Sequence, residues 1–331
     1  MFELLGITPQ GLFSQLLVGL INGSFYAVLS LGLAVIFGML NIINFSHGAQ
    51  YMMGAFIAWI GLTQLGPWFG DPALGFNYWT ALIVAPLVAG ALGIVIERTM
   101  LSRLYKLDHL YGLLLTFGLA LIIEGLFRYA YGVSGQPYEI PEQLQGAINL
   151  GFMFLPKYRA WVIAASLSVC FATWYVIERT KLGSYLRAGT ENPRLVQAFG
   201  VNVPLMITLT YGFGVALAAF AGVLAAPIFT VTPLMGADLI IVVFAVVVIG
   251  GMGSILGSIV TGLGLGLIEG LVKAGVVATL IGKVFDPIPG VNQLVHPLKL
   301  LFSPEASAVV IFVIMVIVLL VRPAGLFGRE R

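Results

Sequence analysis

Charged residues are scarce in this sequence, and their scarcity excludes a water-soluble globular protein. Asp, Glu, Lys and Arg make up 9% of the 331 residues, whereas a soluble domain carries about 25%. Hydrophobic residues account for 60% of the chain, and the mean hydropathy is +1.04. We therefore predict a membrane protein that crosses the bilayer many times.

Other absences narrow the chemistry. Cys170 is the single cysteine, so neither an intrachain disulfide nor a thiolate metal site can form. The three histidines form no HExxH or other metal-ligand spacing, and we expect no metal. The phosphate-binding pattern GxxxxGK followed by Ser or Thr is missing too, and we find no catalytic constellation or cofactor motif. The formal charge of +2 gives no reason to expect nucleic acid.

Long apolar runs predict an all-α fold, a polytopic transmembrane helical bundle of about eight to ten spans. The runs fall at about 12–40, 49–66, 77–97, 110–131, 159–177, 205–228, 236–250, 254–280 and 306–321. The run at 12–40 is too long for one upright helix and is interrupted by glycines, and the run at 236–250 is short. We expect broken or re-entrant helices at these two places.

Basic residues cluster in three short segments that the span count places on one face of the membrane. These segments hold ten of the sixteen Lys and Arg residues, namely Arg98, Arg103, Lys106, Arg179, Lys181, Arg187, Arg194, Arg322, Arg329 and Arg331. Short loops rich in Lys and Arg stay in the cytoplasm. We therefore predict that the C-terminus is cytoplasmic and the N-terminus lies outside.

Small residues recur at four-residue spacing within several apolar runs. One such ladder comprises Gly262, Gly266 and Gly270. Because lipid tails give helices no hydrophobic reason to associate, small residues that allow close backbone approach mark helix–helix contacts. We expect these faces to pack against protein, unless one of them lines a narrow pathway.

Two pairs of opposite charges stand inside apolar runs at the same spacing. Glu124 precedes Arg128 by four residues, and Glu269 precedes Lys273 by four, so each pair shares one helix face. A charge near the bilayer centre costs roughly 2.5–3.5 kcal/mol and tends to have a use. Each pair either neutralises itself near the outer interface or contributes a polar lining or gate for a solute.

Two polar interruptions could line a cavity. Residues 41–48, with the sequence NIINFSHG, form either a cavity lining at membrane depth or a tight cytoplasmic turn. Residues 227–238 contain two prolines six residues apart, which predict a break beside a short helix. Transporters place solute sites at such breaks, although Asp238 could instead cap the short helix.

The loop at about 178–204 contains a short predicted helix. Thr190 or Asn192 can begin it, with Pro193 in the first turn, and Gly200 can end it. An exposed Phe199 among basic neighbours is typical of a docking element for another protein. The alternative is a helix that lies at the lipid interface.

Several stretches together resemble the membrane-spanning permease of branched-chain amino-acid ABC importers, the Leu/Ile/Val type. They cover nearly the whole chain in order and lie at 22–32, 38–48, 97–98, 182–201, 250–254 and 322–328. The last two read GGMGS and RPAGLFG. The resemblance implies one transmembrane permease domain over 1–331, with a cytoplasmic coupling loop at about 178–204.

The resemblance also implies a function and partners. The chain would be the permease subunit of a bacterial importer in the cell inner membrane, with a second related permease, two ATPases and an external solute-binding protein. For the substrate pathway we name Asn22, Asn44, Ser46, His47, Thr232 and Asp238. For coupling to the ATPase we name Gly183, Arg187, Glu191, Pro193, Phe199 and Gly200.

Two other classes of function compete with this hypothesis. A stand-alone secondary carrier could couple Glu124, Asp238 or Glu269 to protons or sodium, but it would need no docking helix. An intramembrane enzyme would need a constellation that the sequence lacks. The sequence does not name the solute, because in such importers specificity is delegated largely to the separate binding protein.

Overall fold

The computed structural model describes residues 8–40, 42–70, 75–105, 107–151, 153–285 and 292–328. Four positions considered above, Asn41, Lys106, Arg329 and Arg331, lie outside the described residues.

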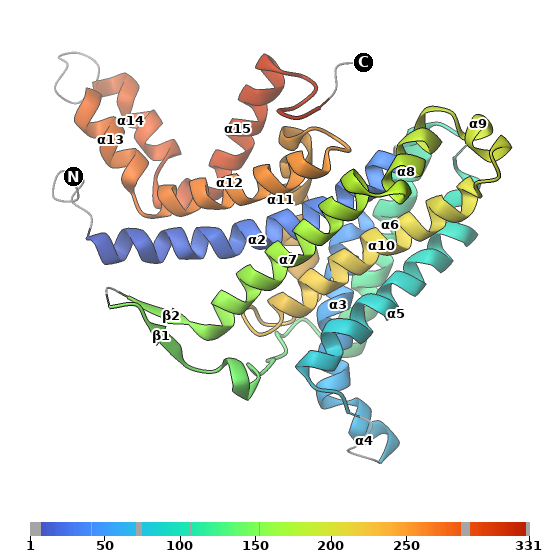
Figure 1. The fold of residues 1–331 in the computed structure, drawn as a ribbon. Coiled ribbons are helices and arrows are strands. Elements are labelled where there is room, and N and C mark those ends of the chain that lie inside the picture. Colours follow the sequence, from blue (N-terminus) through green and yellow to red (C-terminus); the bar gives the residue numbers. More distant parts are fainter. Residues whose placement is uncertain are drawn as a thin grey trace.

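Helices dominate the described chain and confirm the all-α prediction (Figure 1). The long helices are α2 (Pro9–Leu40), α3 (Ser46–Thr63), α5 (Tyr78–Thr99), α6 (His109–Tyr131), α7 (Lys157–Arg179), α10 (Val203–Ala225), α11 (Met235–Gly250), α12 (Ile255–Lys273) and α15 (Ser307–Val321). The short helices are α4 (Leu65–Phe69), α8 (Lys181–Glu191), α9 (Pro193–Ala198), α13 (Val276–Phe285) and α14 (Asn292–Leu301), with 3-10 turns η2 (Leu101–Arg103), η3 (Glu142–Leu144) and η4 (Pro304–Ala306). An antiparallel hairpin of β1 (Ala147–Asn149) and β2 (Phe154–Pro156) precedes α7.

Seven helices in the described part of the chain are long and apolar enough to cross a membrane. They are α2, α5, α6, α7, α10, α12 and α15, the α5 span running on through η2 and the α15 span including η4. The predicted runs at 49–66 and 236–250 correspond to α3 and α11. α11 is short, with 16 residues, and α3 begins with polar residues that are buried inside the bundle.

α2 is one continuous helix of 32 residues, so the break expected within 12–40 is wrong. Its glycines provide packing space instead. A Cβ on Gly19 would meet the backbone of Gly266 and Gly270 in α12, and a Cβ on Gly23 would meet that of Leu263. At 1.5 Å per residue α2 is about 48 Å long. It can therefore span a hydrocarbon core of about 30 Å while tilted or protruding.

The apolar run at 254–280 is divided between two helices. α12 ends at Lys273 and α13 begins at Val276, with Gly275 between them at a φ of 73°. A residue with a side chain is disfavoured at this positive φ, so glycine turns the chain here. α13 and α14 pack on each other, away from α5 and α10 (Figure 1).

The predicted break between α10 and α11 is confirmed. Pro227 and Pro233 both lie in the connection between the two helices. Val231, between the prolines, exchanges two backbone hydrogen bonds of 2.9 Å with Gln136 in the segment that follows α6. The break is therefore held in place by a separate part of the chain.

Two of the stretches that carried the resemblance meet in space. The N–H of Leu326 in the tail donates to the carbonyl of Ile249 at 2.8 Å, and the N–H of Phe327 donates to that of Gly250 at 3.1 Å. The tail at 322–328 therefore pairs with the loop at 250–254 that joins α11 to α12.

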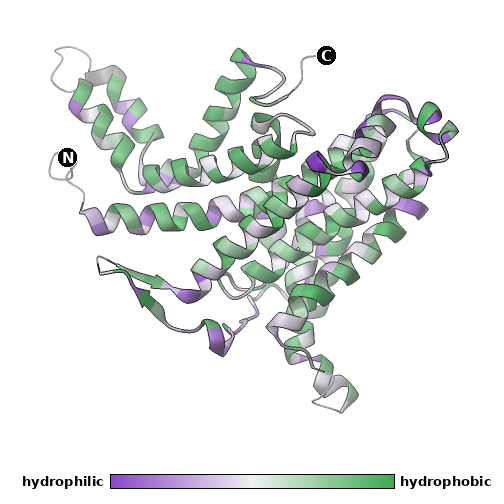
Figure 2. Cartoon of the chain, in the orientation of Figure 1, coloured by the Kyte–Doolittle hydropathy of each residue, from purple (hydrophilic) through white to green (hydrophobic). Residues whose placement is uncertain are grey.

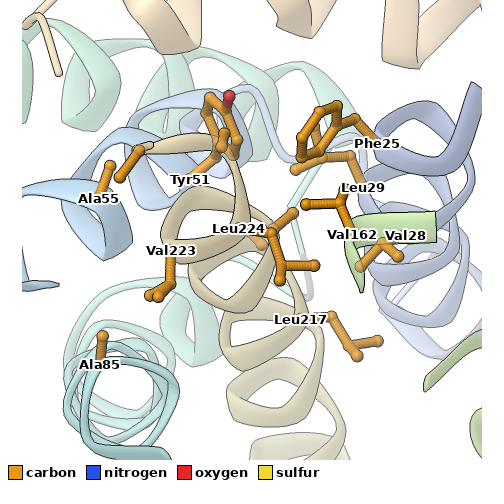
Figure 3. Packing of buried hydrophobic residues seen from close by; sticks show 14 of the residues in the cluster. Phe25, Val28, Leu29, Tyr51, Ala55, Ala85, Val162, Leu217, Val223 and Leu224 are labelled. Atoms are coloured by element: carbon orange, nitrogen blue, oxygen red, sulfur yellow. The ribbon is translucent and has the colours of Figure 1, made fainter. Parts of the chain in front are cut away.

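The core is built around α2, α3 and α10. Phe25 and Leu29 of α2, Tyr51 of α3, and Leu217 and Leu224 of α10 belong to one buried cluster (Figure 3). The outer helices α5, α6, α7 and α15 have less than half of their apolar length buried. The helices are hydrophobic along most of their length (Figure 2), as helices in contact with lipid must be.

Candidate functional site

A buried polar network surrounds the first turn of α3. Ser46 Oγ donates to Asn44 Oδ1 at 2.6 Å, and Asn44 Nδ2 donates to Gln50 Oε1 at 3.2 Å. Gln50 Nε2 in turn donates to Ser46 Oγ at 3.1 Å and to the hydroxyl of Tyr211 in α10 at 3.2 Å. All four residues are at most 1% exposed. The network satisfies these buried groups and fixes the start of α3 to α10.

His47 is completely buried between α3 and α2. Its Nε2 lies 3.0 Å from the carbonyl oxygen of Leu29 and so donates a hydrogen bond. Gly32 makes room for the ring, since a Cβ there would lie 3.0 Å from the Cε1 atom of His47. Leu29 lies about 16 Å from the end of α2 at Leu40, taking 1.5 Å per residue. The contact places His47 well inside the bundle rather than in a surface turn.

Asn44, Ser46 and His47, which we predicted to line the substrate pathway, are thus packed inside protein. Burial in protein is one of the two environments in which polar backbone is tolerated at membrane depth. Their neighbour Phe45 is half-buried. Its ring centroid lies 6.4 Å from that of Phe117 in α6 and 6.2 Å from that of Phe244 in α11. Sequence reasoning singled out the stretch at 41–48 but gave Phe45 no role of its own, because one Phe among many has no distinguishing pattern.

Glu97 near the end of α5 belongs to the resemblance, but sequence reasoning did not predict that its carboxylate is buried. It is 2% exposed. Its Oε1 accepts a hydrogen bond of 2.5 Å from the hydroxyl of Tyr105, and its Oε2 accepts one of 2.7 Å from Thr208 Oγ1 in α10. Burial and the bond to Glu97 raise the pKa of Tyr105 above its usual range, so the phenol remains a donor. A Glu before Arg98 at the end of an apolar run has the sequence pattern of a solvated helix end.

Asn22 and Glu269, predicted for different roles, meet where α2 packs on α12. Glu269 forms the expected ion pair, with Lys273 Nζ 2.5 Å from its Oε1. Its Oε2 accepts a hydrogen bond of 2.9 Å from the hydroxyl of Tyr26, and Asn22 Nδ2 lies 3.5 Å from Oε1. Glu269 is 6% exposed. Donors from two helices therefore surround this carboxylate.

The second predicted pair is not formed. Among the described residues no ion pair within 4 Å joins Glu124 to Arg128. Glu124 is nevertheless buried, at 8% exposure, and it interacts electrostatically with both Arg128 and Asp238 of α11. The structure therefore brings Glu124 into the neighbourhood of Asp238.

Asp238 does not cap α11, so the capping alternative is wrong. The N-cap position is held by Leu234, which makes no side-chain capping bond, and Asp238 is the fourth residue of the helix. A cap must precede the first turn to reach back to its amides. Asp238 is instead an exposed carboxylate in the first turn, where the helix dipole favours a negative charge. Thr232 is half-buried in the connection before it.

The loop at 178–204 contains the predicted short helix and one more. α9 begins as expected, with Asn192 Oδ1 accepting a hydrogen bond of 3.1 Å from the N–H of Leu195, and Pro193 opens the helix. Gly200 follows its end at a φ of 83°. α8 was not foreseen. Both helices lie at the end of the molecule opposite the β1–β2 hairpin (Figure 1).

The six predicted coupling residues divide into two groups. Gly183 and Arg187 contact the end of α7. A Cβ on Gly183 would meet the carbonyl of Ile177, and Arg187 Nη1 donates to that same carbonyl at 2.9 Å. These two residues therefore hold α8 against α7. The others are exposed, namely Glu191, Pro193, Phe199 and Gly200.

Comparison with known proteins identifies the family. A family model described as the permease component of branched-chain amino acid transport systems matches residues 15–319. The chain belongs to this family. It is 28% identical over 321 residues to the high-affinity branched-chain amino acid transport system permease protein BraD of Pseudomonas aeruginosa, covering 95% of each chain. It is 26% identical over 324 residues to the corresponding protein LivH of Escherichia coli, again covering 95% of each.

A further relative has a different designation. The probable branched-chain amino acid transport permease protein LivM of Methanocaldococcus jannaschii is 28% identical over 336 residues, covering 92% of this chain and 91% of its own. No solved structure matches the chain. The matches confirm the resemblance seen in the motifs, and the family is one of transport permeases rather than enzymes.

Proposed function

We propose that this permease forms the translocation path of a bacterial ABC importer for branched-chain or related amino acids. The match to the family over residues 15–319 carries the proposal. ATP hydrolysis on separate subunits drives transport, and the chain itself has no catalytic residues, cofactor or metal. It acts as a single domain over 1–331 in the inner membrane, with its N-terminus outside and its C-terminus in the cytoplasm.

The proposed partners are a second related permease, two ATPases, an external solute-binding protein and membrane lipid. Relatives named LivH and LivM both match this chain along most of its length, which supports a complex built from two permeases of one fold. The proposed pathway residues remain Asn22, Asn44, Ser46, His47, Thr232 and Asp238.

The α8–α9 segment is the proposed docking element for an ATPase. Phe199 is 79% exposed and Leu195 is 54% exposed, so α9 and the residue that follows it present apolar side chains on the surface of the chain. Arg187 and Gly183 fix α8 to the end of α7, which lets force on α9 reach the membrane helices. A few apolar anchors usually carry most of the binding free energy of an interface.

Phe199→Asp tests the docking element. A carboxylate forced into a partner's apolar pocket is buried without a counter-charge, which costs several kcal/mol. We expect that the ATPases no longer co-purify in mild detergent and that ATP-driven uptake is lost, while the chain still inserts into the membrane. Solute binding by the external protein should not change.

Phe69→Asp is the matched control. Phe69 is 68% exposed, but it lies on α4, away from α8 and α9 (Figure 1), so the ATPases should co-purify normally with this variant. Normal co-purification and uptake with Phe199→Asp would remove α9 as the docking element and leave a helix at the lipid interface. Uptake that needs no ATPase at all would instead identify an ion-coupled carrier.

A further inference from the structure

Three phenylalanine rings form a layer between α6 and α11. Both helices pack against α3, and Phe45, directly before α3, contacts a ring on each. It meets Phe117 edge to face at an interplanar angle of 89° and stacks on Phe244 at 29°. Both arrangements are favourable for aromatic pairs. The layer thus joins three segments that are far apart in the sequence.

Two carboxylates lie on one side of this layer. Glu124 follows Phe117 by seven residues on the same face of α6, a distance of about 10 Å along the helix. Asp238 precedes Phe244 by six residues in α11, or about 9 Å. The segment that follows α6 is hydrogen-bonded to the connection that precedes α11, through Gln136 and Val231, so both carboxylates lie in the same direction from the rings.

The opposite side of the layer is apolar. A small cavity of about 10 Å³ lies there, lined by Leu33, Phe37, Ile43, Phe244, Val247 and Met252. Met252 belongs to the loop at 250–254, which pairs with the C-terminal tail. The aromatic layer therefore separates a side with two carboxylates from a small cavity next to this loop.

The exposure of Asp238 indicates what the carboxylate side faces. α11 has 16 residues and is about 24 Å long, shorter than a hydrocarbon core of about 30 Å. Asp238 lies about 18 Å from the end of α11 at Gly250. An exposed carboxylate on a membrane helix is not stable against lipid tails, so we infer that Asp238 faces water or another protein chain.

We propose that Phe45, with Phe117 and Phe244, is a gate in the translocation path, which passes Glu124 and Asp238 before it reaches the rings. The inference rests on the proposed transport function and deepens it. Phe45 is well placed to respond to helix movement, because its N–H donates to Thr116 Oγ1 of α6 at 3.2 Å. Its neighbours Asn44 and Ser46 belong to the network that fixes α3 to α10, so a shift of α3 would move the ring.

Cysteine labelling tests the gate. The complete transporter is prepared in right-side-out membrane vesicles with Cys170→Ala, and one cysteine is placed by Ile43→Cys or Asp238→Cys. A membrane-impermeant thiol reagent is added outside. We expect Asp238→Cys to react and Ile43→Cys to stay unreactive while Phe45 is present. Adding Phe45→Ala should raise the labelling rate of Ile43→Cys at least tenfold.

Three variants serve as controls. Phe171→Ala removes a ring from α7 that is 64% exposed, and it should leave Ile43→Cys unreactive. Phe45→Trp keeps an aromatic blockade and should do the same. Phe244→Ala opens the layer from the other side. Folding of each alanine variant is judged by its level in the membrane and by an unchanged labelling rate of Asp238→Cys. If Phe45→Ala does not fold by these criteria, Phe244→Ala takes its place.

The gate would be overturned if Ile43→Cys reacted equally with and without the ring, or stayed unreactive in both Phe45→Ala and Phe244→Ala. An unreactive Asp238→Cys would overturn the path itself. Labelling needs no transported solute, so these outcomes are independent of the proposed substrate. Failure of the transport function would appear separately, as an unmodified transporter without ATP-driven amino-acid uptake.

Discussion

α12 and α6 share two sequence features but have different surroundings. Both are apolar helices with several glycines and a Glu four residues before a basic residue. In α12 the pair of Glu269 and Lys273 is formed, and 56% of the helix's 18-residue apolar stretch is buried. In α6 only 28% of the corresponding 18-residue apolar stretch is buried. No ion pair within 4 Å joins Glu124 and Arg128 among the described residues.

The difference shows that the neighbouring helix determines whether the same sequence pattern becomes a buried ion pair at a helix–helix contact. Gly262, Gly266 and Gly270 of α12 lie against α2, and a Cβ on Gly266 would meet the backbone of Gly23. In α6 a Cβ on Gly118 or Gly125 would meet nothing within 4 Å. α2 also supplies Tyr26 as a further donor to the carboxylate of α12. Spacing shows which residues share a face, but not what covers that face.

Substitution of Gly266 should have the largest effect. In Gly266→Val the new side chain meets the backbone of α2, which cannot move aside as a flexible side chain can. Overpacking of this kind costs about 1–3 kcal/mol, and we expect at least the upper end here. Thermal unfolding of the purified protein in detergent, or loss of folded protein from the membrane, measures the effect.

Gly264→Val and Gly125→Val are the matched controls. Both glycines lie in membrane helices, and a Cβ on either would meet nothing within 4 Å. The free energy of unfolding of each variant should lie within about 0.5 kcal/mol of that of the parent, as for other surface substitutions. Equal destabilisation by all three valines would mean that α2 does not pack tightly on α12.

Removal of the basic partner should have the next largest effect. Lys273→Met leaves the carboxylate of Glu269 buried without its counter-charge. Breaking a buried pair costs about 3–5 kcal/mol, but the Lys273 side chain is 33% exposed, so we expect about 1–3 kcal/mol. Arg128→Met in α6 should change the free energy of unfolding by less than about 0.5 kcal/mol. A larger loss with Arg128→Met would show that its pair is the structural one.

Much of the fold was predictable because burial of apolar residues follows the sequence directly. Each predicted apolar run contains a helix. The prolines at 227 and 233 predicted the break between α10 and α11, since proline has no backbone N–H to donate within a helix. Asn192, Pro193 and Gly200 predicted α9, because capping depends on neighbouring residues alone.

What could not be predicted depends on residues far apart in the chain. Gly19 and Gly23 suggested a break in α2, but glycines that fit against another backbone leave a helix continuous. The burial of Glu97 depends on Tyr105 and Thr208, and no spacing rule links the three. The contact of Phe45 with two other helices likewise becomes visible only when the chain is folded.

The smallest expected effect is that of Tyr26→Phe, which removes the hydroxyl that α2 donates to Glu269. Hydrogen bonds to charged groups contribute about 1.5–3 kcal/mol, but Lys273 still balances this carboxylate. We therefore expect a loss of about 1 kcal/mol. Tyr129→Phe, in a residue of α6 that is 93% exposed, should have no measurable effect.

Combining Tyr26→Phe with Lys273→Met shows whether the two donors act as one site. Groups in one hydrogen-bond network are coupled by about 0.5–3 kcal/mol, whereas independent sites add within about 0.3–0.5 kcal/mol. If Glu269 stays buried, the double variant should lose more free energy of unfolding than the sum of the single losses, because the carboxylate then keeps only Asn22 as a donor among the described contacts. A purely additive result would mean that Glu269 turns to water once Lys273 is gone.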